Sequence, residues 1–142
     1  MMSLKQRMLR SIKRRAGNVV LRSDVARLGS ATQVSEALRQ LQRDGTLLRI
    51  GTGVYAKTRR SAITGNLIAA GSLETLAIEA LHKLGIAVRP GKAASDYNAR
   101  RTTQLPGKVV VDTGSRRISR MIAVGGRALH YENHYRQAKT DA

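Results

Sequence analysis

The sequence predicts an α+β protein, with a winged helix-turn-helix at the N-terminus and a second, small α+β domain after it. Three observations support this fold class. Two helical patterns with a glycine-containing turn between them are followed directly by a β-hairpin pattern, which is the order of a winged helix-turn-helix. A further amphipathic helix precedes several β-like segments. The cores have to be aliphatic, because only 3% of the 142 residues are aromatic.

The first predicted element is an amphipathic helix that starts at Leu4 and takes Ser3 as its N-cap. Its apolar residues recur at every fourth position, and lysines and arginines cover the remaining surface. Gly17 and Asn18 end this helix. A short β-prone run follows over residues 19–21.

The helix-turn-helix comes next. Ser23 is predicted to cap a short helix over residues 24–28, and Gly29 is predicted to stop it with a positive φ angle. Ser30 and Gln33 fit a capping box that begins the second helix. The apolar stripe of this helix consists of Val34, Ala37, Leu38 and Leu41. Gly45 ends it, so the second helix is the recognition helix of the predicted motif.

A β-hairpin is predicted directly after this helix. Its strands cover residues 47–50 and 54–56, and residues 51–53 form a glycine-rich tip. A hairpin in this position is the wing of a winged helix. Residues 1–60 therefore form the predicted DNA-binding domain.

The rest of the chain is divided in the same way. Residues 61–71 lack a strong periodic pattern and are interpreted as a linker, with some helix around 67–70. A small α+β domain is predicted over residues 72–135. Residues 136–142 are polar and are interpreted as a tail.

The second domain is predicted to open with an amphipathic helix that begins at Ser72 and ends at Gly85. Its β-like segments are residues 86–88, 109–112, 118–124 and 128–131. Gly125 and Gly126 mark a tight hairpin between the last two segments. These strands are predicted to form the sheet against which the apolar face of the helix packs.

Charge indicates the class of partner. The chain carries 26 basic and 9 acidic residues, a net charge of +17, and residues 1–60 alone carry 14 basic and 3 acidic residues, a net charge of +11. A polyanion is the expected partner. No apolar run approaches the roughly 20 residues of a membrane-spanning helix. The chain has no cysteine and no secretory apolar segment, so we expect a cytoplasmic protein without a membrane partner.

Candidate DNA-contacting residues lie on the second helix of the motif and on the wing. The helix positions off the apolar stripe are Thr32, Gln33, Ser35, Glu36, Arg39, Gln40 and Arg43. Arg pairs with guanine and Gln with adenine, while Ser and Thr near a helix start reach phosphates. The candidates on and after the wing are Arg49, Thr52, Lys57, Arg59 and Arg60. A solvated helix face and a plain hairpin are the alternative interpretations.

Catalysis finds little support in the sequence. The nine acidic residues are scattered, and His82, His130 and His134 are isolated from one another. The tip at residues 51–53 is not a nucleotide-binding loop, because no helix follows it. We therefore expect no enzyme activity, no cofactor and no metal site.

Several motifs carry a family resemblance. They are Leu28-Gly29-Ser30, Val34-Ser35-Glu36-Ala37-Leu38, Gly45-Thr46-Leu47 and Arg49-Ile50-Gly51-Thr52-Gly53-Val54-Tyr55. These segments resemble the N-terminal winged helix-turn-helix of the abortive-infection antitoxins of type IV toxin-antitoxin systems. The later segment 103–110 is similar to the second domain of that family, so the resemblance covers roughly residues 3–131.

The resemblance implies a transcriptional repressor. Its first domain would bind inverted repeats in the promoter of its own operon, through the helix face from Thr32 to Arg43 and the wing from Arg49 to Gly53. Its second domain would act as the antitoxin against a nucleotidyltransferase-type toxin, without a stable complex. The resemblance implies no catalytic residue.

Two other classes of function stay open at this point. One is an RNA- or ribosome-associated basic winged-helix protein, which the high positive charge permits. The other is a protein-interaction adaptor that uses the sheet of the second domain. We expect a monomer or a weak dimer, because no coiled-coil segment is present to set the spacing of two DNA-binding heads.

Overall fold

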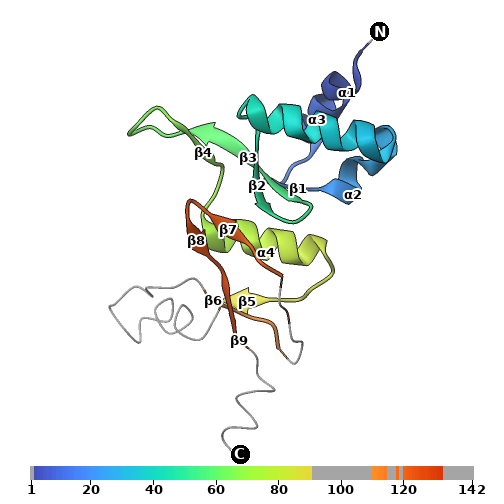
Figure 1. Ribbon diagram of the computed structural model, residues 1–142. Coiled ribbons are helices and arrows are strands. Elements are labelled where there is room, and N and C mark those ends of the chain that lie inside the picture. The colour runs from blue at the N-terminus through green and yellow to red at the C-terminus, as the bar shows by residue number, and fades with distance from the viewer. Residues whose placement is uncertain (1, 91–109, 115–117, 119, 133–142) are drawn as a thin grey trace, which may run out of the picture. The chain divides into compact units, whose positions relative to one another are not determined.

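The computed structural model describes residues 2–90, 110–114, 118 and 120–132. The chain forms two compact units, Met1–Gly71 and Ser72–Ala142, and each is described by itself. Both units combine helices with small sheets, so the α+β fold class is confirmed (Figure 1). The predicted tail at 136–142, the segment 103–109 and His134 lie outside the described residues.

The first unit has the element order of a winged helix-turn-helix. Its elements are α1 (Leu4–Arg14), β1 (Val19–Leu21), α2 (Arg22–Val25), a 3-10 helix (Ala26–Leu28), α3 (Ala31–Arg43), β2 (Leu47–Gly51), β3 (Val54–Arg60) and β4 (Leu67–Ala69). Strand β3 lies between β1 and β2 in an antiparallel sheet, and β4 also pairs with β3. The helix-turn-helix comprises α2, the 3-10 helix and α3, and the wing is the hairpin of β2 and β3.

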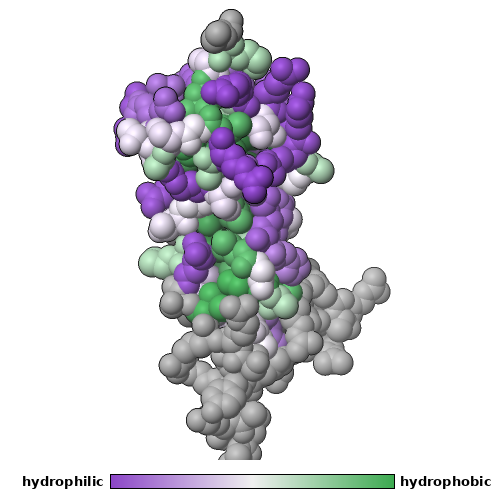
Figure 2. Space-filling model, turned by 90° about the vertical axis from the view of Figure 1, so that its right-hand side faces the viewer, coloured by the Kyte–Doolittle hydropathy of each residue, from purple (hydrophilic) through white to green (hydrophobic). Residues whose placement is uncertain are grey.

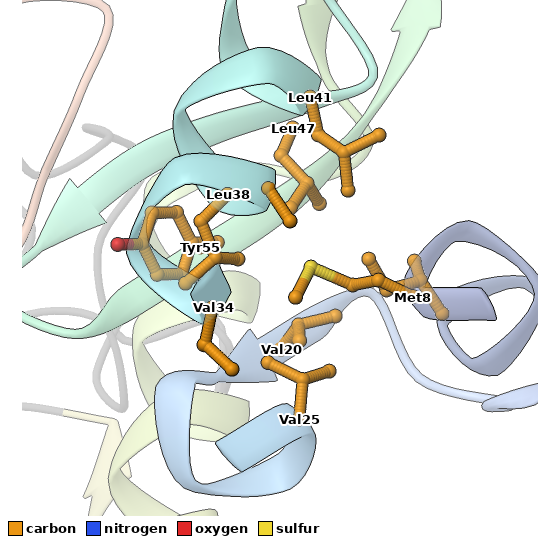
Figure 3. Close-up of a cluster of buried hydrophobic side chains, with 10 residues drawn as sticks. Met8, Val20, Val25, Val34, Leu38, Leu41, Leu47 and Tyr55 are labelled. Atoms are coloured by element: carbon orange, nitrogen blue, oxygen red, sulfur yellow. The ribbon is translucent and has the colours of Figure 1, made fainter. Parts of the chain in front are cut away.

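One cluster of buried side chains holds these elements together (Figure 3). Its members are Met8, Ile12, Val20, Val25, Val34, Ala37, Leu38, Leu41, Leu47 and Tyr55, which come from all three helices and from β1, β2 and β3. The predicted apolar stripe of α3 lies wholly within this cluster, so the opposite face of α3 is left for solvent or for a partner. The hydroxyl of Tyr55 points away from the cluster.

Local side-chain bonds begin the two long helices of the first unit. In α1 the Ser3 hydroxyl accepts from the Gln6 backbone N–H at 3.2 Å, and the Gln6 side chain accepts from the Ser3 N–H at 2.9 Å. Ser30 and Gln33 form the same capping box in α3, at 3.2 and 3.0 Å. Both predicted caps are confirmed. Neither helix has an acidic residue in its first turn.

Two details of the helix-turn-helix differ from the prediction. Helix α2 begins at Arg22, so its N-cap residue is Leu21 rather than Ser23, and the Asp24 carboxylate accepts from the Leu21 backbone N–H at 2.9 Å. Gly29 has a φ of −173° and a ψ of −168°, which is an extended conformation and not the predicted left-handed one. The chain turns there without a positive φ because the short 3-10 helix ends α2 before Gly29 is reached.

The segment interpreted as a linker differs as well. Residues 61–71 belong to the first unit, and β4 within them is a strand where some helix was predicted. Its register joins Thr58 to Ala69, Arg59 to Ile68 and Arg60 to Leu67. The prediction failed because a strand depends on its partner, and the extension of β3 that pairs with β4 is not visible in local periodicity.

The described part of the second unit contains α4 (Leu73–Lys83), β5 (Arg89–Pro90), β6 (Val110–Asp112), β7 (Ala123–Val124), β8 (Arg127–Ala128) and β9 (His130–Glu132). Strand β6 lies between β5, which is antiparallel to it, and β9, which is parallel. The predicted β-segment at 86–88 carries no strand, and the strand comes directly after it.

Two sequence predictions in this unit are confirmed. The Ser72 hydroxyl accepts from the Thr75 backbone N–H at 3.2 Å and caps α4, as predicted. Gly125 and Gly126 form the predicted hairpin turn between β7 and β8, with φ angles of 59° and 80°. Two consecutive positive φ angles are what a type I′ turn requires.

Candidate nucleic-acid interface

The outward face of α3 carries the predicted recognition residues. Thr32, Gln33, Arg39 and Arg43 are exposed, and Ser35, Glu36 and Gln40 are half-buried. They occupy the side of the helix opposite the stripe that packs into the core. The structure therefore presents these seven side chains on one surface.

Glu36 is the centre of this surface. Its carboxylate lies 2.6 Å from Arg39 Nη1 and 3.8 Å from Arg43 Nη2, and Gln40 Nε2 lies 3.5 Å from it. All three side chains of the ion pairs are about half-exposed, so each pair contributes roughly 0–1 kcal/mol to stability. These contacts orient both arginines and reduce the positive potential of α3 itself. A ligand phosphate would have to compete with Glu36 for them.

The wing tip lies at the same end of the first unit as the start of α3. Strand β2 ends at Gly51, and the turn residues Thr52 and Gly53 connect it to β3. Arg49 and Thr52 are exposed, and Arg49 Nε donates to the Gly51 carbonyl oxygen at 3.3 Å. Figure 2 views the first unit from this end and shows hydrophilic side chains on both of its flanks.

Arg22 connects the wing to the recognition helix. Its backbone N–H donates to the Gly53 carbonyl oxygen at 2.9 Å, and its guanidinium Nη2 donates to the Ala31 carbonyl oxygen at 2.9 Å. One residue at the start of α2 thus fixes the wing tip relative to the first turn of α3. Sequence reasoning missed this role, because neither contact follows a local pattern that a sequence reveals.

The three candidates that follow the wing, Lys57, Arg59 and Arg60, lie away from its tip. Arg59 and Arg60 end β3, five and six residues beyond Val54, which places them roughly 20 Å from the tip along the strand. Lys57 Nζ donates to the Arg15 carbonyl oxygen at 2.6 Å and so has a structural contact. Lys57 and Arg60 line a hollow of about 490 Å³ near the C-terminal end of α3, together with Asp44, Thr46 and Leu67. The structure thus separates these three residues from the α3 face and the wing tip.

The titratable groups that the structure describes in the second unit form no comparable site. His82 and His130 are both exposed, and His82 Nε2 lies 3.3 Å from the Val88 carbonyl oxygen. The Tyr131 hydroxyl donates to the Arg120 carbonyl oxygen at 2.5 Å. Burial raises the pKa of Tyr131 above its usual value, and the positive charge of Arg120 partly opposes this shift.

The described ranges contain neither a metal-binding cluster nor a membrane-spanning helix. No three His, Asp or Glu side chains of those residues lie close enough together to hold a metal ion. None of the helices in that part of the chain is long and apolar enough to cross a membrane.

The order of elements and the surface formed by α3 and the wing tip define a winged helix-turn-helix protein. The chain belongs to a family of unknown function, DUF6088, whose model matches residues 6–138. No curated protein matches the chain by sequence.

Proposed function

We propose that this protein is a sequence-specific DNA-binding repressor that regulates its own operon. The observation that carries the proposal is the joint presentation of α3 and the wing tip. The α3 face offers Arg, Gln, Ser and Thr side chains in the arrangement used to read base edges and hold phosphates. Arg22 holds the wing at the start of that helix.

Charge supports the same ligand. The first unit carries 14 basic and 3 acidic residues, and its net charge of +11 is the larger share of the +17 of the whole chain. Such a surplus attracts a phosphate backbone regardless of sequence. The polar face of α3 would supply the base contacts that charge alone does not provide.

The second part of the proposal is that the protein is the antitoxin of a type IV toxin-antitoxin system. Its support is the resemblance of the helix-turn-helix and wing motifs to abortive-infection antitoxins. The functional partner would be a nucleotidyltransferase-type toxin, and the second unit would oppose it without a stable complex.

The decisive experiment for repression is a gel-shift titration of the full chain. The probe is the upstream region of its own gene, with scrambled duplex and structured RNA as competitors, at about 150 mM salt to weaken non-specific binding. We expect a preference for the promoter of at least ~10³-fold over scrambled duplex. Equal affinity for all duplexes would refute the repressor function, and a preference for RNA would support an RNA-binding winged helix.

The antitoxin half has a separate test. Expression of the neighbouring gene alone is expected to arrest growth, and co-expression of this protein is expected to restore it. A variant with Arg39→Ala and Arg43→Ala should still restore growth while losing the promoter shift, because the proposed antitoxin activity resides in the second unit. Loss of rescue in this variant would contradict that division of roles.

A further inference from the structure

A second basic surface lies on α1, outside the residues that sequence reasoning assigned to DNA contact. An open hollow of about 530 Å³ is lined by Arg7, Arg10, Ser11, Arg14, Arg15 and Leu28, with Met2 at its side. Arg7, Arg10 and Arg14 are exposed and are spaced three and four residues apart, so they share one face of the helix. We name this surface the α1 arginine hollow.

Among the described residues, Arg15 alone of this surface pairs with an acidic side chain, that of Asp24 at 3.8 Å. The other two acidic groups of the first unit have partners elsewhere: Asp44 pairs with Lys5 at 2.5 Å, and Glu36 faces Arg39 and Arg43. None of the described acidic side chains forms an ion pair with Arg7, Arg10 or Arg14. Like charges one helical turn apart repel each other and destabilise a helix. The cluster therefore costs stability unless an anion occupies it.

The hollow adjoins the helix-turn-helix. Arg15 Nη2 donates to the Asp24 carbonyl oxygen at 2.9 Å, which joins the end of α1 to α2. Leu28, at the other wall of the hollow, directly precedes the turn that leads to Ser30 and α3. Helix α2 and the 3-10 helix thus contact the hollow through Asp24 and Leu28, and contact the wing tip through Arg22.

We propose that the α1 arginine hollow binds the sugar-phosphate backbone of duplex DNA, beside the bases that α3 reads. This inference rests on the proposed function for the identity of the ligand. Arg7 and Arg14 are separated by about 10 Å along the helix axis, at a rise of about 1.5 Å per residue. That length corresponds to about three intervals between the phosphates of one strand, which lie about 3.4 Å apart along the duplex axis. The contact reads no sequence and extends the footprint beyond the recognition helix.

The test compares two double variants of the full chain that remove the same charge. The first is Arg10→Gln with Arg14→Gln. The matched control is Lys13→Gln with Arg127→Gln. Lys13 lies on another face of α1, where it lines the separate 490 Å³ hollow that contains Asp44, and Arg127 is exposed in β8 of the second unit. Affinity for promoter and scrambled duplexes is measured by fluorescence anisotropy over a range of salt concentrations.

We expect the first variant to lower the slope of log affinity against log salt by about two for both duplexes. Affinity at 150 mM salt should fall by about 10- to 30-fold, while the control changes the slope by less than about half a unit. The melting temperature of the first variant should stay the same or rise, because repulsion within α1 is relieved.

An unchanged slope, or an equal loss in both variants, would overturn the inference. The proposed function fails in a different way, namely by an equal affinity of the wild type for promoter and scrambled duplex. A lower salt slope in Arg10→Gln with Arg14→Gln, without the same change in the control, would then still support a site for the DNA backbone. Binding of the wild type to RNA in preference to any duplex would overturn both.

Discussion

Position 29 requires glycine because a side chain would not fit there, and not because of its backbone conformation. Its extended φ and ψ are open to any residue, but a Cβ here would lie 2.8 Å from Gln33 Oε1 and 3.0 Å from Leu4 Cδ2. Gln33 cannot move away without losing its bond to the Ser30 N–H. The turn of the helix-turn-helix and the cap of α3 are therefore coupled through this one contact.

We predict that Gly29→Ala lowers the free energy of unfolding by about 1 kcal/mol, the usual cost of a lost N-terminal cap interaction. Urea denaturation measures it. The informative comparison is Gly29→Ala in a Gln33→Ala background, where the obstructing side chain is gone. The penalty of Gly29→Ala should be clearly smaller there. Strict additivity of the two changes would contradict the proposed steric cause.

Glu36 reduces the positive charge of the recognition surface. Its contacts with Arg39 and Arg43 hold both guanidinium groups on α3 and place one negative charge where we propose that DNA binds. A carboxylate there repels phosphates in general but accepts from the amino group of cytosine. Glu36 is thus expected to favour specificity over affinity.

Glu36→Gln should accordingly raise affinity for scrambled duplex by about threefold or more at low salt, because one repulsive charge is removed. The preference for the promoter over scrambled duplex should fall. Asp44→Asn is the matched control, since it removes the same charge at the C-cap of α3. Equal gains in both variants would show that net charge alone is responsible, and anisotropy titrations distinguish the two cases.

At the scale of elements, the features that could be predicted from the sequence are those set by residues close together along the chain. Ser3, Ser30 and Ser72 mark helix starts through side-chain bonds that span three residues, and the apolar stripe of α3 follows the period of one helix. Strand β4 and the contacts of Arg22 depend on partners distant along the chain. The α3 face was accordingly predictable, whereas the separation of Arg59 and Arg60 from the wing tip depended on how far β3 extends.

The wing provides a prediction at this scale. Arg22→Gln removes the bond to the Ala31 carbonyl oxygen but leaves the backbone bond to Gly53. Promoter affinity should fall about fivefold because the wing is held less firmly against α3, and the salt slope should not change. Amide hydrogen exchange at the wing tip should accelerate.

Arg59→Gln provides the control for this experiment, because it removes an exposed arginine at the far end of β3. A slope lowered by about one unit in Arg22→Gln would indicate that Arg22 contacts a phosphate directly. That result would contradict a purely positioning role.

For the whole molecule, the division into two units separates the proposed roles. The helix-turn-helix, the wing and the α1 arginine hollow all belong to Met1–Gly71. Promoter duplex should therefore slow amide exchange in α1, α3 and the wing. At 100 times its dissociation constant, the duplex stabilises the folded state relative to the unfolded state by about 2.7 kcal/mol. Amides of α4 and β6 should exchange at unchanged rates. Equal protection of both units would contradict this division, and scrambled duplex is the control.

The capping boxes of α1 and α3 both use glutamine, whereas α4 has Glu74 in its first turn. Replacing Gln33 with glutamate is a common way to make a helix start more stable, by a few tenths of a kcal/mol up to about 1 kcal/mol. It would also neutralise the positive end of α3 where we propose that a phosphate binds. Thermostability and DNA affinity are thus opposing selection criteria at this position, and a variant library screened by melting temperature alone would enrich for proteins that no longer bind their operator.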